Sequence, residues 1–139
     1  MMKKSILLIL AFMLVAPCAF ADVYQKEKLI VLDKDKAGGG TGILYGVYAF
    51  TRDMPSKDHA VKEIGWLTLK PGDAIGYHEH KTNEDVYIVV SGTGLFKDVD
   101  GTEHQVKPGD ITICRKGQRH GMTNTGKEDL VMISVIAEQ

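Results

Sequence analysis

Residues 72–92, with the sequence GDAIGYHEHKTNEDVYIVVSG, decide the fold and hold most of the candidate site. In a β-strand, residues i and i+2 point to the same face, so His78 and His80 can both point into one cavity. A third histidine, His120, lies 40 residues downstream behind a second set of glycines. Three imidazoles and a nearby carboxylate make a site of the kind that holds Zn, Mn, Fe, Ni or Cu.

Around this stretch the chain reads as short strands separated by turns, without convincing helical periodicity. The segments are rich in Val, Ile, Tyr and Thr, and turn residues such as Gly92 and the Asp100-Gly101 pair separate them. The pattern therefore predicts an all-β protein. The predicted strands are 29–32, 43–50, 61–69, 75–80, 86–90, 95–99, 103–106, 110–114, 120–124 and 130–136.

A four-residue turn sequence occurs twice, each time between two predicted strands and ahead of a candidate ligand. Lys70-Pro71-Gly72-Asp73 recurs as Lys107-Pro108-Gly109-Asp110. Two similar halves of this size favour an antiparallel barrel or jelly roll, which protects its strand edges by closing or doubling the sheet.

Residues 72–124 resemble the two sequence motifs of the cupin superfamily. The first motif is Gly, five residues, His-x-His, three or four residues, Glu, six residues and Gly. The second is Gly, five residues, Pro-x-Gly, two residues, His, three residues and Asn. Eight of the ten specified positions are matched, by Gly72, His78, His80, Gly92, Gly109, Gly117, His120 and Asn124. The resemblance implies a double-stranded β-helix (jelly-roll) barrel that forms a homodimer, with one divalent metal inside the barrel near one mouth.

The chain departs from the motif at the carboxylate. Counting back from Gly92 places the motif Glu at Asp85, whereas Glu84 fits the shorter spacing from His80 but then requires a glycine where Ser91 stands. Adjacent strand residues face opposite sides, so a regular strand lets only one of the two acids reach the metal. We expect Asp85 to be the fourth ligand, with Glu84 as the alternative. The shorter Asp leaves open binding through water or a site of three histidines alone.

A second departure is Arg115, which stands where the motif has proline and would place a guanidinium near the rim of the barrel or simply in an exposed loop. Strand parity gives the expected pocket lining. Tyr87 and Val89 share a face with Asp85, and Gln118 and Met122 share one with His120.

A tryptophan and a run of three glycines lie outside the motifs. Trp66 is expected to fill the core, and Gly38-Gly39-Gly40 is expected to be a flexible loop.

The first 21 residues are typical of a signal peptide. Lys3 and Lys4 precede an apolar run, and Ala19-Phe20-Ala21 has the small-x-small pattern that signal peptidase cuts. We therefore expect a periplasmic or secreted protein of one domain, residues 22–139, with a formal charge of −3 from 15 basic and 18 acidic residues. That charge does not favour nucleic acid, and no second apolar segment is long enough to span a membrane. Cys114 is the one cysteine in this domain and is expected to be an inert core residue.

Two classes of function remain open at this point. The resemblance implies either a metal-dependent dioxygenase, isomerase or decarboxylase that acts on a small oxygenated molecule, or a non-catalytic module that binds a metal or small ligand. In the enzyme, His78, His80, His120 and Asp85 would hold the metal and Tyr87 is the candidate proton donor. The sequence assigns no further general base, and fold alone does not decide between the two classes.

Overall fold

The structure is a computed structural model that describes residues 21–138, and these form an all-β fold with only two short 3-10 helices. The expected fold class is confirmed. The elements are η1 (Lys26–Lys28), β1 (Ile30–Val31), β2 (Lys34–Asp35), η2 (Ala37–Gly39), β3 (Ile43–Phe50), β4 (Val61–Leu69), β5 (Ala74–Glu79), β6 (Glu84–Ser91), β7 (Gly94–Lys97), β8 (Glu103–Val106), β9 (Ile111–Cys114), β10 (Arg119–Asn124) and β11 (Leu130–Ala137).

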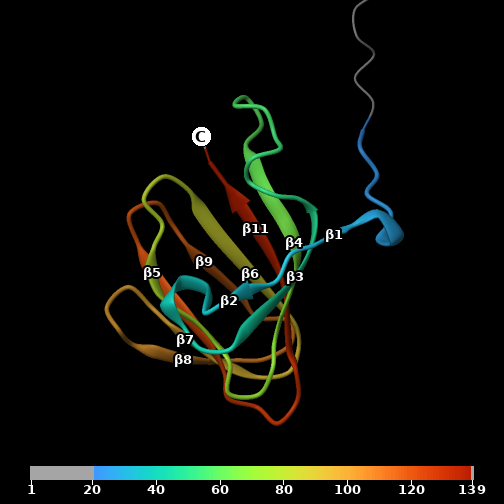
Figure 1. The fold of residues 1–139 in the computed structure, drawn as a ribbon. Coiled ribbons are helices and arrows are strands. Elements are labelled where there is room, and N and C mark those ends of the chain that lie inside the picture. The colour runs from blue at the N-terminus through green and yellow to red at the C-terminus, as the bar shows by residue number, and fades with distance from the viewer. Residues whose placement is uncertain (1–20, 139) are drawn as a thin grey trace, which may run out of the picture.

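The strands form two antiparallel sheets that enclose one core (Figure 1). The larger sheet has the order β1-β3-β4-β11-β6-β9, with β2 also paired to β3, and the smaller sheet has the order β5-β10-β7-β8. Neighbours in space are therefore often distant in sequence, as a double-stranded β-helix requires. The buried side chains of both sheets meet in the core, which includes Leu44, Tyr48, Leu67, Leu69, Ile75, Tyr87, Val89, Phe96, Val106, Met122, Leu130 and Met132.

The repeated Lys-Pro-Gly-Asp sequence forms the same turn in both places. The backbone N–H of Asp73 donates to the carbonyl of Lys70 at 3.0 Å, and that of Asp110 donates to the carbonyl of Lys107 at 3.0 Å. Gly72 and Gly109, the third residue of each turn, have φ of +86° and +94°. Proline followed by glycine suits a turn of this kind, because proline fixes a negative φ and glycine accepts a positive one.

The motif asparagine, Asn124, has a structural role at the end of β10. Its side-chain amide donates to the carbonyls of Leu69 and Glu128, each at 2.8 Å, and its amide oxygen accepts from the N–H of Gly126 at 2.9 Å. Asn124 is 1% exposed. Its hydrogen bonds fix the turn between β10 and β11 against the end of β4.

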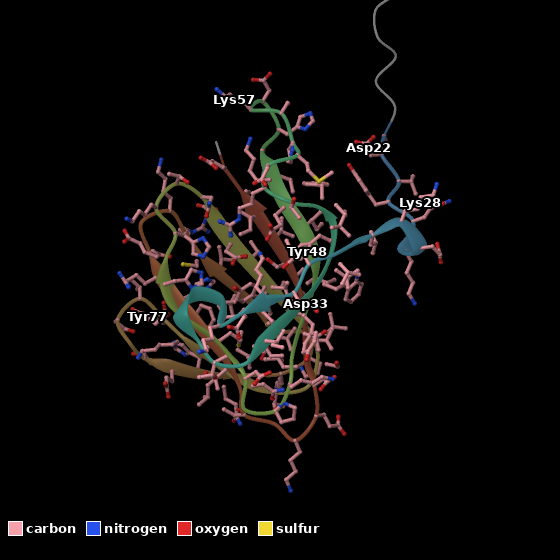
Figure 2. The ribbon with its side chains drawn as sticks, viewed as in Figure 1. Asp22, Lys28, Asp33, Tyr48, Lys57 and Tyr77 are labelled. Carbon is pink, nitrogen blue, oxygen red and sulfur yellow. The ribbon has the colours of Figure 1, made fainter. Side chains whose placement is uncertain are left out.

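The segment between β3 and β4 extends beyond the barrel near the end of β11 (Figure 1). The N–H of Glu138 donates to the carbonyl of Ala60 at 2.8 Å, which ties the two together. Figure 2 shows Lys57 at the tip of this segment and Tyr48 within the body of the protein. Within residues 21–138, no helix is long and apolar enough to cross a membrane. The predicted signal peptide lies outside the described residues except for Ala21.

Two core predictions have different outcomes. Trp66 is 44% exposed, so its assignment to the core is wrong. The reason is parity, because Gly65 and Leu67 of β4 point inward and Trp66 between them must point outward. Cys114 is buried and free, and burial raises its pKa to about 11, so its thiol stays protonated at neutral pH as expected of an inert residue.

Candidate metal centre

Backbone pairing brings the three motif histidines together at one end of the smaller sheet. His78 in β5 lies opposite His120 in β10. His80 follows the end of β5, where its N–H donates to the carbonyl of Gln118 at 2.9 Å and its carbonyl accepts from the N–H of Gly117 at 2.7 Å. Asp85 reaches the same place from β6 of the larger sheet.

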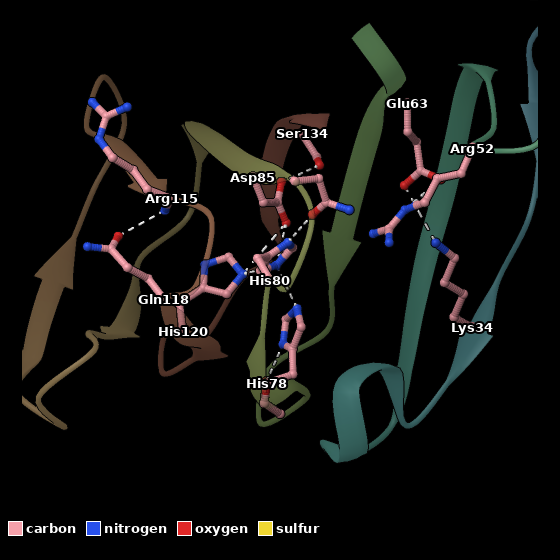
Figure 3. A network of polar contacts seen from close by, with 12 residues as sticks. Lys34, Arg52, Glu63, His78, His80, Asp85, Arg115, Gln118, His120 and Ser134 are labelled. Carbon is pink, nitrogen blue, oxygen red and sulfur yellow. Dashed lines mark hydrogen bonds and ion pairs between the residues drawn. The ribbon is translucent and has the colours of Figure 1, made fainter. Parts of the chain in front are cut away.

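The four side chains converge on one point (Figure 3). The Nε2 atom of His80 lies 3.0 Å from Nε2 of His78 and 2.9 Å from Nε2 of His120. Asp85 Oδ2 lies 3.6 Å from the Nε2 atoms of both His80 and His120. Two nitrogens bound to one metal at about 2.0–2.1 Å, with angles near 90–110°, lie roughly 2.8–3.4 Å apart. The distances from His80 Nε2 to the other two nitrogens therefore fit a divalent metal, and Asp85 Oδ2 lies slightly farther away than this range.

Two of the imidazoles are oriented by acceptors on their outer nitrogens. His78 Nδ1 lies 2.8 Å from the carbonyl of Gly76, and His80 Nδ1 lies 2.7 Å from Asn83 Oδ1. An acceptor at Nδ1 favours the tautomer with the proton there, which leaves the Nε2 lone pair free for a metal.

The third imidazole is held by packing. The ring of His120 stacks on Tyr87 with centroids 5.1 Å apart, and Phe96 contacts it edge-on at 5.6 Å. Its Nδ1 is buried without a hydrogen-bond partner among residues 21–138. No fixed acceptor in the described residues therefore selects the tautomer of His120.

Asp85, 3% exposed, is the inward-facing acid of the Glu84-Asp85 pair. Its Oδ1 accepts from the hydroxyl of Ser134 at 3.0 Å. Burial raises the pKa of Asp85 to about 6, which the nearby hydroxyls of Tyr87 and Ser134 partly oppose. Glu84 faces outward, where its carboxylate pairs with Arg115 at 3.3 Å.

The histidines are in the state that a metal requires. Burial is the main cause that lowers the pKa of His78, His80 and His120, and for His120 the value falls to about 3. The charges of His78 and His80 add to the effect on His120. All three rings are therefore neutral at pH 7 and offer lone pairs rather than protons.

The Gly38-Gly39-Gly40 segment, expected to be a flexible loop, is packed against the metal centre instead. A Cβ on Gly38 would lie 2.9 Å from Nδ1 of His78, and one on Gly40 would lie 1.9 Å from the carbonyl oxygen of Ala74. Gly38 and Gly39 belong to η2, which lies directly against β5. Glycine is needed at positions 38 and 40 because the backbone there approaches β5 too closely for a side chain.

A cavity of about 180 Å³ adjoins the candidate ligands, with His78 and Asp85 in its wall. Of the four residues predicted to line a pocket, Tyr87 lines this cavity, whereas Val89 and Met122 are buried in the core. Gln118 does not line it either, and its amide oxygen accepts from the N–H of Arg115 at 2.9 Å.

Three charged residues that carried no sequence signal also line this cavity, namely Lys34, Arg52 and Glu63. They lie outside the motifs in sequence, and Ser134 and Asn83 beside the ligands were also missed. The inward face of β4, on which Glu63 alternates with apolar residues, is the one pattern that could have identified a buried carboxylate.

The comparisons with known proteins agree with this fold. A family model described as "Cupin domain" matches residues 65–136. A protein from Thermotoga maritima named "Oxalate-binding protein" is 34% identical over 70 residues, which cover 50% of this chain and 57% of that protein. The chain thus spans little more than half the length of this curated relative.

Two solved structures are similar over most of their own length. A "predicted oxalate decarboxylase" from Thermotoga maritima has a TM-score of 0.75 at 24% identity, and the match covers 85% of this chain and 100% of that one. An "uncharacterized conserved protein with double-stranded beta-helix domain" from Klebsiella pneumoniae has a TM-score of 0.52 at 30% identity, covering 64% and 88%. The similarity to the predicted oxalate decarboxylase, at 24% identity, supports only the barrel fold.

Proposed function

This chain belongs to the cupin family, and we propose that it is an exported protein that binds one divalent transition metal and, through it, a small carboxylate-bearing molecule. The convergence of three Nε2 atoms and one carboxylate oxygen beside a cavity is the observation that carries the proposal. The four residues that would hold the metal are His78, His80, Asp85 and His120.

A divalent metal held there would act as a Lewis acid that attracts an anionic oxygen ligand to its remaining positions. The residues of the chain prepare the site for that role. Gly76 and Asn83 orient two imidazoles, and Ser134 orients Asp85 through a hydrogen bond. A site whose ligands are held before the metal arrives loses little free energy in ordering them.

The size of the cavity and the relative's name support a small carboxylate as ligand. A volume of about 180 Å³ is below the roughly 300 Å³ at which pockets for drug-sized ligands begin. The Thermotoga maritima relative is named for oxalate binding. Oxalate is small enough for such a cavity and offers carboxylate oxygens to a metal.

Binding without turnover is the form of the proposal that the side chains support. Burial raises the pKa of Tyr87 well above its usual value, and Asp85 raises it further. Tyr87 therefore holds its proton tightly and is a poor proton donor to a ligand. Turnover stays the alternative, and consumption of ¹³C-oxalate by the metal-loaded protein, followed by NMR, would establish it.

Metal analysis of the purified full chain tests the proposal. We expect about one equivalent of a transition metal by inductively coupled plasma mass spectrometry, and loss of that metal in His120→Ala. Oxalate should then bind the loaded protein more tightly than the metal-free protein in isothermal titration calorimetry. A folded wild-type protein that takes up no Mn, Fe, Ni, Cu or Zn would refute the metal site.

Export and self-association are further parts of the proposal. The basic and apolar start of the sequence supports cleavage before Asp22, which mass spectrometry of the protein from a periplasmic or culture fraction would identify. The family resemblance supports a homodimer, which light scattering after size-exclusion chromatography would measure. A monomer mass or an uncleaved N-terminus would contradict the corresponding part.

A further inference from the structure

We propose that Arg52 and Lys34 form an anion-binding arm opposite the metal centre, so that the ligand is a small dicarboxylate held at both ends. One carboxylate would bind at the metal and the other would bind to the two cations. This inference rests on the proposed function, and it adds the charge of the ligand and the residues that select it.

The two cations share one buried carboxylate. Lys34 Nζ lies 3.7 Å from Glu63 Oε1, and Arg52 Nε lies 3.9 Å from Glu63 Oε2 (Figure 3). Both distances exceed the range of a hydrogen bond, so Glu63 attracts the cations without fixing them. Both side chains of the arm are therefore free to bind the carboxylate of a ligand.

Residues in or next to three strands bring the arm and its partner Glu63 to the cavity. Lys34 lies in β2, Arg52 follows the end of β3, and Glu63 lies near the start of β4. All three line the cavity of about 180 Å³ that also contacts His78 and Asp85. Figure 3 shows the arm on one side and the candidate ligands on the other. A small molecule in so limited a space can contact both.

The exposure of the arm suits the capture of an anion from solvent. The side chains of Lys34 and Arg52 are 36% and 47% exposed, whereas that of Glu63 is 7% exposed. Both cations are therefore accessible to an anion in solvent. The guanidinium offers several N–H donors in a plane, which matches a carboxylate better than a single ammonium does.

The charges of the cavity also favour a dianion. Lys34 and Arg52 balance the carboxylates of Glu63 and Asp85, so a divalent metal would leave an excess of two positive charges. A dicarboxylate cancels that excess, whereas a monocarboxylate leaves one positive charge in a partly buried site. Uncompensated buried charge is costly, which is a physical reason for the site to select dianions.

Calorimetric titration of the manganese-loaded full chain tests the arm, with oxalate and acetate as probes. Acetate has one carboxylate, which would bind the metal and leave the two cations without a direct contact, so Arg52→Gln should weaken acetate much less than oxalate. The same substitution should weaken oxalate about tenfold or more, which corresponds to one charge-assisted contact. Glu63→Gln should tighten oxalate, because the cations lose their competing partner.

Arg115→Gln is the matched control, since Arg115 also pairs with one glutamate but lies outside the cavity. Retained manganese is measured in every variant after titration. Equal oxalate affinity in Arg52→Gln and wild type would overturn the arm while the metal site stands. If Arg52→Gln fails to fold, Lys34→Gln takes its place with the same expectation. A wild-type protein without manganese would instead refute the proposed function.

Discussion

Replacing Gly38 with alanine should weaken metal binding, although Gly38 is not one of the candidate ligands. Gly38 has φ of +60°, and an added Cβ would lie 2.9 Å from His78 Nδ1 and 3.1 Å from the carbonyl oxygen of Gly76. The hydrogen bond of 2.8 Å between these two atoms orients His78. The methyl group must push the imidazole or the β5 backbone aside. Loss of such an orienting contact typically weakens metal binding by about 10–100-fold.

Gly39→Ala separates this effect from backbone strain. Gly39 has φ of +77°, and a Cβ there meets nothing within 4 Å. Both variants bear the left-handed strain of an L-residue, about 1–2 kcal/mol, which lowers the melting temperature by roughly 3–10 °C. Only Gly38→Ala should also lose metal affinity in a chelator-competition titration. Equal metal affinity in the two variants would refute the reasoning that Gly38 protects the position of His78.

Three further predictions follow from the site. Asp85→Ala should lose metal and Glu84→Ala should retain it, and the reverse result in metal analysis would show that Glu84 is the ligand. Urea unfolding of the metal-free protein should show lower stability at pH 5 than at pH 7.5. The lowered pKa of His120, about 3 against 6.5, means that the unfolded chain takes up a proton below pH 6.5 that the folded state refuses. That loss is at most about 1.4 kcal/mol per pH unit. The raised pKa of Asp85, about 6 against 3.8, opposes this loss of stability between pH 6 and pH 3.8. The lowered pKa values of His78 and His80 add to the loss. Equal or greater stability at pH 5 would therefore contradict the prediction. Tyr48→Phe should keep or raise the unfolding free energy, because its buried hydroxyl has no partner among residues 21–138, and a loss above about 1 kcal/mol would reveal a hydrogen bond there.

The sequence predicted the elements that follow from local pattern. The bounds of β3, β4 and β8 agree with the predicted strands, because alternation and turn residues delimit them. Counting from Gly92 placed Asp85 on the inner face of β6, since the period of a strand is two residues. These results depend on neighbours along the chain, which a sequence displays directly.

What the sequence did not predict depends on contacts between distant segments. The Gly38 segment reads as a loop in isolation, and only its approach to β5 shows why it lacks side chains. Arg52, which follows β3, forms an ion pair with Glu63 of the neighbouring strand β4, and neither residue belongs to a motif. Trp66 was misplaced because a large aromatic favours burial on average, whereas its position in β4 faces outward.

The candidate ligands come from different sheets, with Asp85 on β6 and the histidines on or beside β5 and β10. A metal bound there would cross-link the two layers of the barrel, so that they could not separate without releasing it. Folding and metal supply would then be thermodynamically linked, with about 2.7 kcal/mol of added stability at a free metal concentration 100 times the dissociation constant. Wherever the metal is scarce, the same chain would unfold and be degraded faster, so the amount of the protein would depend on the metal content of its surroundings.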